Sequence, residues 1–567
     1  MNPGVAGADG GGLPSARVLL VLLLVFAAMW FGSLDHRKLI ASDEGRYAEI
    51  GREMAVSGDW VTPRYNGVKY FEKPVLLYWA TAAAFTLFGE TEWAARLWVG
   101  LCGFAGVLLL YFTGAALFGR TAGLLAAAVL GSSVLWVGGG HITTTDMGVS
   151  FFLECALCAL LLAQRAGLAA QAARRCMLVC WAAMALAVLS KGLIGIVLPG
   201  MVLAGYLAVT RDWRLLSRLH IGKGLCVFLI VAAPWFVWVS VRNPEFAHFF
   251  FIHEHFGRFT EIEGYNRRGG WWYFIVILGI GMLPWLAALP GAFSLGALRA
   301  EAKHPAAALL RPRLLLLLWV VLIFLFFSVS RSKLPGYILP VVPAIALLAG
   351  IALADMQRKG LLIVLGSAFL LMLCALYGSG HVSRFAPNPQ MLGAYAVYES
   401  WVRSAVIAML AGTILAFVWV WSSTSVNAGR AGALLLFAFA GHAGIQAIFL
   451  GHESLRENSS AYDVAQKVNR VIDRTQPFYS VKLFDHTLPF YIKKTMTLVA
   501  HRDELAFGLE QEPGLWVPTV AEFEKRWAAD KKPMALMTEA TFAQLQAGGL
   551  PMRMVARDAR RVIVAKP

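Results

Sequence analysis

Charged residues are scarce in this sequence. Asp, Glu, Lys and Arg together make up 15% of its 567 residues, whereas 58% of the residues are hydrophobic. Soluble globular domains contain about 25% charged and about 45–50% apolar residues. The low charge excludes a disordered chain or a nucleic-acid-binding protein, and the composition is not that of a collagen. A protein that crosses the membrane several times fits this composition.

Cysteine is also scarce, and its distribution excludes a disulfide framework. All seven cysteines lie in apolar runs, and the polar stretch after about residue 450 contains none. Cys155 and Cys158 have the spacing of a metal pair, but they lie in the middle of a hydrophobic segment. A metal there would need further ligands nearby, so we interpret both as structural thiols.

Long apolar runs are abundant, by contrast. A membrane-spanning helix needs about 20 mostly apolar residues. The first run lacks a small-residue cleavage site, so it is interpreted as an anchor and not as a signal peptide. The sequence therefore predicts a polytopic α-helical membrane domain over residues 1–450, with about thirteen transmembrane helices by the length rule. The predicted helices lie near residues 17–34, 93–118, 122–139, 147–164, 175–190, 192–210, 222–241, 271–290, 313–329, 336–354, 360–378, 402–422 and 431–450.

The Lys and Arg residues of the short connections predict the orientation. They concentrate in every second connection, where the acids are few: Asp212, Glu301 and Asp355. Such a bias marks the cytoplasmic side and places the N-terminus there. With an odd number of helices, residues 451–567 then lie on the outer side of the membrane. Much of the net charge of +16 reflects this topology and not a nucleic-acid patch.

Residues 451–567 have the pattern of a small soluble α/β domain. Helical periodicity covers residues 459–472 and 520–529, and strand-like runs cover residues 496–500, 533–538, 553–556 and 561–565. We find no catalytic motif in this domain.

The first outer loop, residues 35–92, mixes ionisable and aromatic side chains. Ser42 is placed to cap a helix that begins at Asp43, carries Tyr47 on an apolar stripe and suits the membrane interface. Asn66-Gly67 between two short extended runs predicts a β-hairpin. The hairpin would bring a group of polar and aromatic side chains close together: Arg64, Tyr65, Lys69, Tyr70, Glu72 and Lys73.

Two acids at the mouths of predicted helices, Asp43 and Asp146, are candidate catalytic groups together with Glu44. Each has a structural alternative, because acids stabilise helix N-termini and Asp146 is placed to cap a helix. Arg46 and Lys73 could alternatively serve only to bind lipid headgroups, with their long side chains reaching to the membrane surface. A carboxylate beside the hydrocarbon region of a membrane costs free energy unless it is paired or takes part in function. Two such acids on one side of the membrane therefore favour a functional role.

The other outer loops add cations: Lys191, Arg258, Arg331 and Lys333. With Arg46 and Lys73, they predict a site that handles phosphate groups, since Arg binds phosphate bidentately and Lys acts as a point charge. Tyr47, Tyr70 and Tyr337 are candidates for substrate contacts. No cofactor is required by this pattern, although Glu72, His253 and His255 have the chemistry to hold a divalent metal.

Three clusters carry a resemblance to a known family: residues 42–47 (SDEGRY), residues 70–74 (YFEKP) and residues 332–337 (SKLPGY). Through roughly residues 15–450 the chain resembles the C-type, lipid-carrier-dependent glycosyltransferases (the GT-C fold) of the branch related to protein mannosyltransferases. Within it, the chain is most similar to the bacterial lipid A aminoarabinose transferases.

The resemblance implies transfer of 4-amino-4-deoxy-L-arabinose from undecaprenyl phosphate to a lipid A phosphate, which gives resistance to polymyxin and other cationic peptides. It also implies that Asp43 is the essential acid after the first helix and that Asp146 is the second outer-loop acid. The sugar is implied by the resemblance alone.

The residues themselves argue against a nucleotide-sugar donor, because the candidate groups face outward and no dinucleotide-binding fingerprint is present. A polyprenyl-linked donor fits better, since its tail can lie along apolar helices. Two alternatives stay open: a transferase of the same fold that moves another lipid-linked sugar to a glycan or a protein hydroxyl, and a lipid flippase. A flippase would place ionisable groups within its helices, often in two matched halves, and the sequence shows neither pattern.

Overall fold

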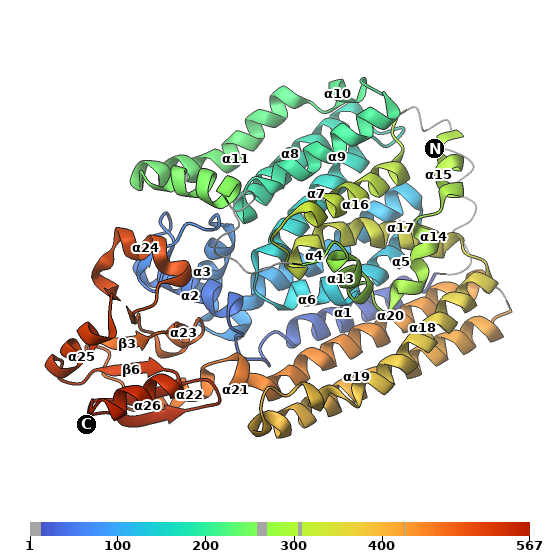
Figure 1. Cartoon of the computed structure of the whole chain (residues 1–567). Coiled ribbons are helices and arrows are strands. Elements are labelled where there is room, and N and C mark those ends of the chain that lie inside the picture. The colour runs from blue at the N-terminus through green and yellow to red at the C-terminus, as the bar shows by residue number, and fades with distance from the viewer. Residues whose placement is uncertain (1–12, 258–268, 304–308, 425) are drawn as a thin grey trace. The chain divides into compact units, whose positions relative to one another are not determined.

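The computed structural model describes residues 13–257, 269–303, 309–424 and 426–567 (Figure 1). The chain forms two compact units. The first, here called the membrane unit, comprises Met1–Ser33, Val99–Gly380 and Trp401–Ile448. The second, here called the sheet unit, comprises Leu34–Trp98, His381–Ser400 and Phe449–Pro567.

Long apolar helices dominate the chain. Among the described residues, nine helical stretches are long and apolar enough to cross a membrane. They are α4 (Glu92–Phe118), α7 (Thr145–Ala163), α8 (Ala170–Lys191), α11 (Ile221–Arg242), α16 (Pro312–Val329), η4 with α17 (Pro335–Val341, Val342–Asp355), α18 (Arg358–Ser379), η6 with α19 (Pro389–Met391, Leu392–Ser422), and α20 with η7 and α21 (Val426–Gly451, His452–Leu455, Arg456–Ser459).

Two further helix pairs are sharply bent. The pair α5 (Arg120–Gly131) and α6 (Val134–His141) bends by 62°, and the pair α13 (Tyr273–Gly281) and η2–α14 (Trp285–Ala292) bends by 105°. Counting each pair as one span gives up to eleven spans in the described residues. The remaining helices of the membrane unit are shorter: α1 (Ala16–Gly32), α9 (Ile194–Thr210), α10 (Leu215–Arg218), η1 (His248–Gly257) and α15 (Leu295–Lys303).

Each of the thirteen predicted apolar segments therefore contains a helix or a bent helix pair, but the count of thirteen spans is not confirmed. Two of the segments, α1 and α9, have only 17 helical residues. The two bent pairs are broken where Ser132–Ser133 and Pro284 interrupt the apolar pattern. Serine and proline both favour such breaks, because serine hydroxyls bond to the helix backbone and proline lacks an N–H.

The sheet unit is built on a six-stranded sheet of order β5-β4-β3-β6-β8-β7. The first four strands in that order are parallel, whereas β8 runs antiparallel to β6 and to β7. The strands are β3 (Phe478–Val481), β4 (Thr497–Val499), β5 (Trp516–Val517), β6 (Met534–Met537), β7 (Arg553–Arg557) and β8 (Val562–Ala565). Short helices join them: α22 (Tyr462–Val468), α23 (Leu488–Ile492), η8 (Asp503–Leu505), α24 (Ala506–Gln511), η9 (Pro513–Leu515), α25 (Val520–Ala529) and α26 (Glu539–Ala547).

The residues of the first outer loop share a hydrophobic core with this sheet. Leu39, Ala48 and Phe85 pack in one buried cluster with Phe490 and Ile563. The opposite face of the sheet has a separate core of Val481, Trp527, Val564 and their neighbours. The first outer loop contributes α2 (Asp43–Ser57), β1 (Arg64–Tyr65), β2 (Val68–Lys69) and α3 (Leu76–Phe88) to this unit, which also holds η5 (Val382–Phe385).

The prediction of an α/β domain at the C-terminus is confirmed, with local errors. Helix α25 and strands β4, β6, β7 and β8 lie where the pattern placed them. The helix predicted over residues 459–472 is wrong in extent: α21 ends at Ser459, and α22 covers only Tyr462–Val468. The sequence between them turns because Ser460 lies in extended backbone, with φ −137° and ψ 149°.

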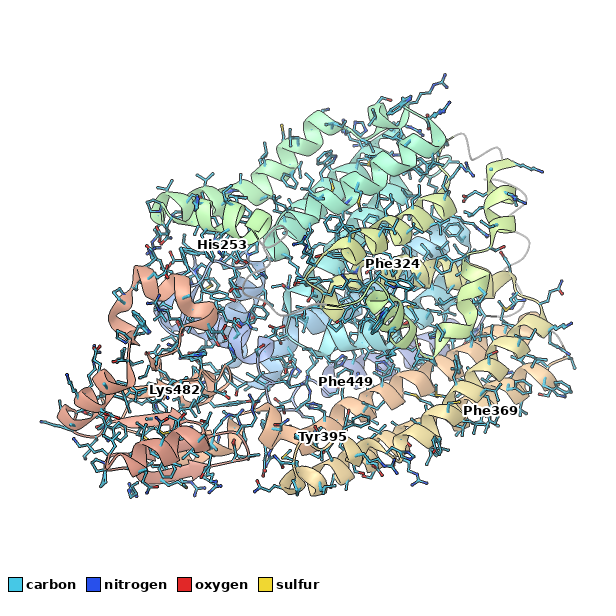
Figure 2. The ribbon with its side chains drawn as sticks, viewed as in Figure 1. His253, Phe324, Phe369, Tyr395, Phe449 and Lys482 are labelled. Carbon is cyan, nitrogen blue, oxygen red and sulfur yellow. The ribbon has the colours of Figure 1, made fainter. Side chains whose placement is uncertain are left out.

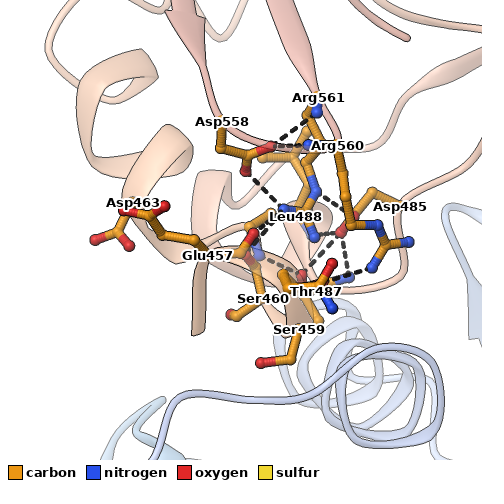
Figure 3. A network of polar contacts seen from close by, with 12 residues as sticks. Glu457, Ser459, Ser460, Asp463, Asp485, Thr487, Leu488, Asp558, Arg560 and Arg561 are labelled. Carbon is orange, nitrogen blue, oxygen red and sulfur yellow. Dashed lines mark hydrogen bonds and ion pairs between the residues drawn. The ribbon is translucent and has the colours of Figure 1, made fainter. Parts of the chain in front are cut away.

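A buried ion-pair network stabilises the sheet unit where its last strand meets α21 (Figure 3). Arg561, only 2% exposed, donates from Nε to Asp485 Oδ2 at 2.6 Å and from Nη1 to Asp558 Oδ2 at 2.7 Å. The other oxygen of Asp485 accepts from the backbone N–H and the hydroxyl of Thr487, at 2.9 and 2.8 Å. The network therefore fixes the 485–487 loop.

Candidate functional site

The predicted hairpin is confirmed. Strands β1 and β2 pair antiparallel, with Arg64 opposite Lys69. Asn66 and Gly67 have φ angles of 54° and 80°, the left-handed values that a two-residue turn of this kind needs. The Asn66 side chain also exchanges two hydrogen bonds with the backbone of Met496, both at 2.7 Å. These bonds tie the hairpin to the sheet.

Helix α2 begins at Asp43 as predicted and ends before Gly58, which has a φ of 70°. Two expectations about it are wrong. The Ser42 side chain makes no capping hydrogen bond, and ten of the fifteen helix residues are buried, so α2 does not have a single buried stripe. Its place at the membrane interface stays a prediction. Its charged side chains can be buried because they are paired within the sheet unit, as Arg52 is with Glu49 at 2.6 Å.

Asp43 and Glu44 are adjacent in sequence but lie in opposite environments. The Asp43 side chain is 41% exposed, and its Oδ1 lies 3.4 Å from Nη2 of Arg46. The Glu44 side chain is 1% exposed and lies between Arg37, at 3.1 Å, and Arg96, at 2.8 Å. Glu44 also accepts a hydrogen bond from the Ile40 backbone at 3.0 Å.

The charge of Glu44 is fixed by these partners. Burial by itself would raise the pKa of Glu44, but Arg37 and Arg96 outweigh it and hold the pKa at about 2. Arg96 additionally donates to the backbone carbonyls of Leu34 at 2.7 Å and Lys38 at 3.0 Å. Glu44 is thus a permanent carboxylate at the centre of a buried cluster.

Arg46 occupies the next turn of α2 and is almost fully buried. Its Nη1 donates to the hydroxyl of Tyr70 at 3.2 Å, and its guanidinium binds both carboxylate oxygens of Glu504, at 2.9 and 2.8 Å. Its Nε has no hydrogen-bond partner among the described residues. The ring of Tyr47 lies 5.6 Å from the guanidinium carbon. The structure thus brings together Asp43, Arg46, Tyr47 and Tyr70, as the sequence predicted.

Glu504 is the member of this cluster that sequence reasoning missed, since it lies far along the chain in a segment without a recognisable motif. Burial raises the pKa of Glu504 to about 7, and the negative charges of Glu72, Asp503 and Asp43 add to the rise against the opposing effect of Arg46. His486 lies 3.9 Å from Glu504, and burial followed by Arg46 lowers the pKa of His486 to about 3. Glu504 is therefore the group of this cluster that titrates near neutral pH.

We expect Glu504→Gln to flatten the pH dependence of stability. A pKa raised from 4.5 to about 7 means that the folded protein binds a proton that the unfolded chain has lost. The free energy of unfolding then falls by up to about 1.4 kcal/mol per pH unit as the pH rises from about 4.5 to about 7. Melting temperatures of the parent and the variant from pH 4.5 to 8 measure this slope. An identical slope in both proteins would exclude the assignment.

Residue 45 must be a glycine because the backbone of α2 lies very close to the 485–487 loop at this position. A Cβ at residue 45 would lie in steric overlap with the carbonyl oxygen of His486 and 2.7 Å from Cγ2 of Thr487. The ion-pair network of Figure 3 holds that loop in place, so the loop has little freedom to retreat. The first turn of α2 and the loop are thus fixed against each other.

Gly45→Ala is therefore expected to shift the first turn of α2 and with it Asp43 and Arg46. We expect a loss of about 1–3 kcal/mol in the free energy of unfolding, as for overpacking elsewhere. Gly58→Ala provides a contrast: its Cβ would meet nothing within 4 Å, and the cost there comes only from the φ of 70°. Thermal melts of both variants make the comparison, and an unchanged melting temperature for Gly45→Ala would contradict the assigned contact.

A second cluster lies in the membrane unit. Asp146, in the first turn of α7, forms an ion pair with Lys191, the last residue of α8. The Lys191 ammonium lies 4.5 Å from the centre of the Tyr337 ring, and Gly336 packs directly against the Asp146 carboxylate. Asp146 lies two residues after the N-cap residue Thr144, and its carboxylate is paired with Lys191.

Three of the other predicted cations lie among the described residues. Lys333 is buried and donates from Nζ to the Ser330 carbonyl at 2.5 Å, whereas Arg331 is exposed. Lys73 belongs to the sheet unit and donates to the Glu72 carbonyl at 2.9 Å. Arg258 lies outside the described residues.

The predicted metal set stays a prediction. His253, on η1, is labelled in Figure 2; its side chain is 59% exposed and lies 3.7 Å from Glu254. Glu72 is buried in the sheet unit, and the side chain of His255 lies outside the description. Among the described residues, no group of three or more His, Cys, Asp or Glu side chains is arranged to hold a metal ion.

Comparison with known proteins identifies both parts of the chain. A family model described as aminoarabinose transferase C-terminal domain matches residues 464–566, and one described as dolichyl-phosphate-mannose-protein mannosyltransferase matches residues 72–238. An undecaprenyl phosphate-alpha-4-amino-4-deoxy-L-arabinose arabinosyl transferase of Pectobacterium carotovorum is 34% identical over 409 residues, which cover 69% of this chain and 71% of that protein.

The protein of the same name from Pseudomonas aeruginosa PAO1 is 34% identical over 348 residues, so the match spans 60% of that relative. Similarity to a solved structure extends further. The crystal structure of ArnT from Cupriavidus metallidurans bound to undecaprenyl phosphate has 40% sequence identity and a TM-score of 0.91, and the match covers 97% of this chain and 98% of that one. The chain therefore belongs to the ArnT family of aminoarabinose transferases, membrane glycosyltransferases of the GT-C fold.

Proposed function

We propose that this protein transfers 4-amino-4-deoxy-L-arabinose from undecaprenyl phosphate to a phosphate of lipid A, on the periplasmic side of the bacterial inner membrane. The N-terminus then lies in the cytoplasm, and residues 451–567 lie in the periplasm. The observation that carries the proposal is the 40% identity, over nearly the whole chain, to an ArnT whose crystal structure contains undecaprenyl phosphate. The aminopentose would mask negative charge on lipid A and so lower the binding of polymyxin.

The reaction exchanges one phosphate ester of the sugar for another. The bond between the anomeric carbon and the undecaprenyl phosphate oxygen breaks, and its electron pair leaves with that oxygen. A lipid A phosphate oxygen forms the new bond, so no net proton transfer is needed. The transition state has oxocarbenium character, as in glycoside hydrolysis, and negative charge grows on the departing phosphate.

The cations predicted from the sequence are suited to stabilise that charge. Within the part of the chain that the structure describes, Arg46 Nε has no hydrogen-bond partner, whereas its other nitrogens are bound. Lys191 and Lys333 are held in the membrane unit by Asp146 and Ser330, and Lys73, Arg258 and Arg331 complete the proposed phosphate-binding set. Preorganised donors of this kind are each worth about 10²–10³ in rate. Tyr47, Tyr70 and Tyr337 would position the sugar and the phosphates.

The acids have different proposed roles. Asp43 is exposed enough to meet a substrate and would orient the acceptor or the cationic amino group of the sugar, or act as a base if the acceptor is a hydroxyl. Asp146 would position Lys191. Glu44 is fully engaged by Arg37 and Arg96, and we assign it the positioning of α2 and no contact with the substrate. Direct displacement with inversion requires that no glycosyl adduct forms on Asp43 or Asp146.

The experiment is mass spectrometry of lipid A from cells that make the donor, lack their own transferase and carry this chain. A gain of one aminopentose mass per modified phosphate is the expected result. Unmodified lipid A, with the protein present in the inner membrane, would contradict the proposal. In that case another lipid-linked sugar or another acceptor, such as a glycan or a protein hydroxyl, would be the next candidate.

A further inference from the structure

A groove between α18 and α19 lies apart from both clusters described above. Six side chains line this open groove, and the space over them is about 510 Å³. Both helices lie side by side in the membrane unit (Figure 1), and the labelled Phe369 marks α18 in Figure 2. The lining residues are Arg358, Lys359, Leu362, Ile363, Phe417 and Trp421.

The groove is apolar along most of its length. Phe417 and Trp421 lie one turn apart on α19, with nearly parallel rings 6.3 Å apart. Ile363 and Trp421 are 58% and 67% exposed, although both lie on apolar helices long enough to cross a membrane. Surfaces of this kind on spanning helices face acyl chains, and tryptophan is enriched where chains meet headgroups.

Two cations close the groove at one end. Arg358 and Lys359 are the first two residues of α18, and Arg358 Nη2 donates to the Ser423 carbonyl at the end of α19. The Arg358 Nε is buried without a hydrogen-bond partner among the described residues, and the Lys359 side chain is exposed. Neither cation faces a carboxylate in the lining of the groove.

One acid lies among several cations at this end of the groove. Asp355, the nearest acid along the chain, is 76% exposed and lies 3.6 Å from Arg313. Arg430 of α20 donates to the backbone carbonyls of Ala354 and Met356. The end of the groove therefore keeps an excess of positive charge. This end belongs to the connections whose Lys and Arg bias predicts the cytoplasmic side.

We propose that this groove binds one anionic phospholipid of the surrounding membrane. Its phosphate would lie at Arg358 and Lys359, where Arg can supply a charge-assisted hydrogen bond and Lys a point charge. One acyl chain would lie against Leu362, Ile363, Phe417 and Trp421. A zwitterionic lipid would fill the apolar part equally well, but the cationic group of its headgroup would offset the negative charge of its phosphate and weaken the attraction to both cations. The site is a structural lipid site and does not depend on the proposed transfer reaction.

The test is native mass spectrometry of the full-length protein in detergent, titrated with phosphatidylglycerol or with phosphatidylcholine. We expect the parent to retain phosphatidylglycerol in preference to phosphatidylcholine. Each cation near an anionic headgroup contributes about fivefold in affinity, so Lys359→Gln should weaken phosphatidylglycerol binding about fivefold and Arg358→Gln/Lys359→Gln about 30-fold. Lys223→Gln, at an exposed lysine near the start of α11, is the matched control and should bind like the parent.

Equal retention of the two lipids by the parent would overturn the proposal. So would an equal loss of phosphatidylglycerol from Lys359→Gln and Lys223→Gln, because a general charge effect would then suffice. Arg358→Gln also removes a helix contact, so its folding is checked by gel filtration and circular dichroism. Should the double variant misfold, Lys359→Gln decides alone, since its side chain is exposed.

Discussion

Asp43→Asn is expected to lower aminoarabinose transfer by about 10²–10³-fold, the loss typical when a preorganised group that acts electrostatically on the reacting groups is removed. The substitution removes the charge but preserves the shape of the side chain. Asp43 is 41% exposed, and within the described part of the chain it pairs with Arg46 at 3.4 Å. We therefore expect folding to be nearly unchanged. Lipid A mass spectrometry in cells and initial rates with purified protein measure the loss.

A matched carboxylate separates this effect from a general loss of charge. Asp212 pairs with Arg218 at 2.9 Å in a connection predicted to be cytoplasmic, and Asp212→Asn should leave transfer unchanged. If Asp43→Asn were as active as the parent, Asp43 would be no more than a favourable charge at the N-terminus of α2. A stable glycosyl adduct on Asp43 would instead replace direct displacement with a two-step reaction.

Periodicity and turn chemistry were enough to predict most of the local structure. The start of α2 at Asp43 and the left-handed turn at Asn66-Gly67 both follow from signals contained in a few residues, and the predicted end of α8 at residue 190 is one residue short of Lys191. The apolar segments were found because each helix in a membrane must satisfy its own backbone hydrogen bonds within one continuous run. The exact number of spans does not follow, because helix bends depend on packing.

Long-range pairing is what the sequence did not predict. Strand β3, Phe478–Val481, is central in the sheet and buried on both faces, so its four residues have no alternation to reveal it. Glu504 reaches Arg46 across 458 positions of sequence. In α2 charged residues occur all round the helix and not on one face, a pattern typical of an exposed helix, yet ten of its residues are buried. Charges on every face require partners, and only the fold shows which ones.

Asp43 and Glu44 show that the sequence also does not distinguish the roles of two neighbouring residues. Both acids lie in the motif that carries the family resemblance, and nothing in the sequence separates their roles. The fold separates them by placing one side chain at 41% exposure and the other at 1%. A shared motif can thus combine a residue suited to meet the substrate with one that holds the helix in position.

Glu44→Gln is accordingly expected to destabilise the protein by about 3–5 kcal/mol, because it leaves Arg37 and Arg96 buried without their counter-charge. The expected signs are a strongly lowered melting temperature and little protein in the membrane. The triple variant Arg37→Met/Glu44→Leu/Arg96→Met should recover part of the stability, although the bonds from Arg96 to the carbonyls of Leu34 and Lys38 are still lost. If Glu44→Gln melted like the parent but lost transfer, Glu44 would act on the substrate and would join Asp43 among the catalytic residues.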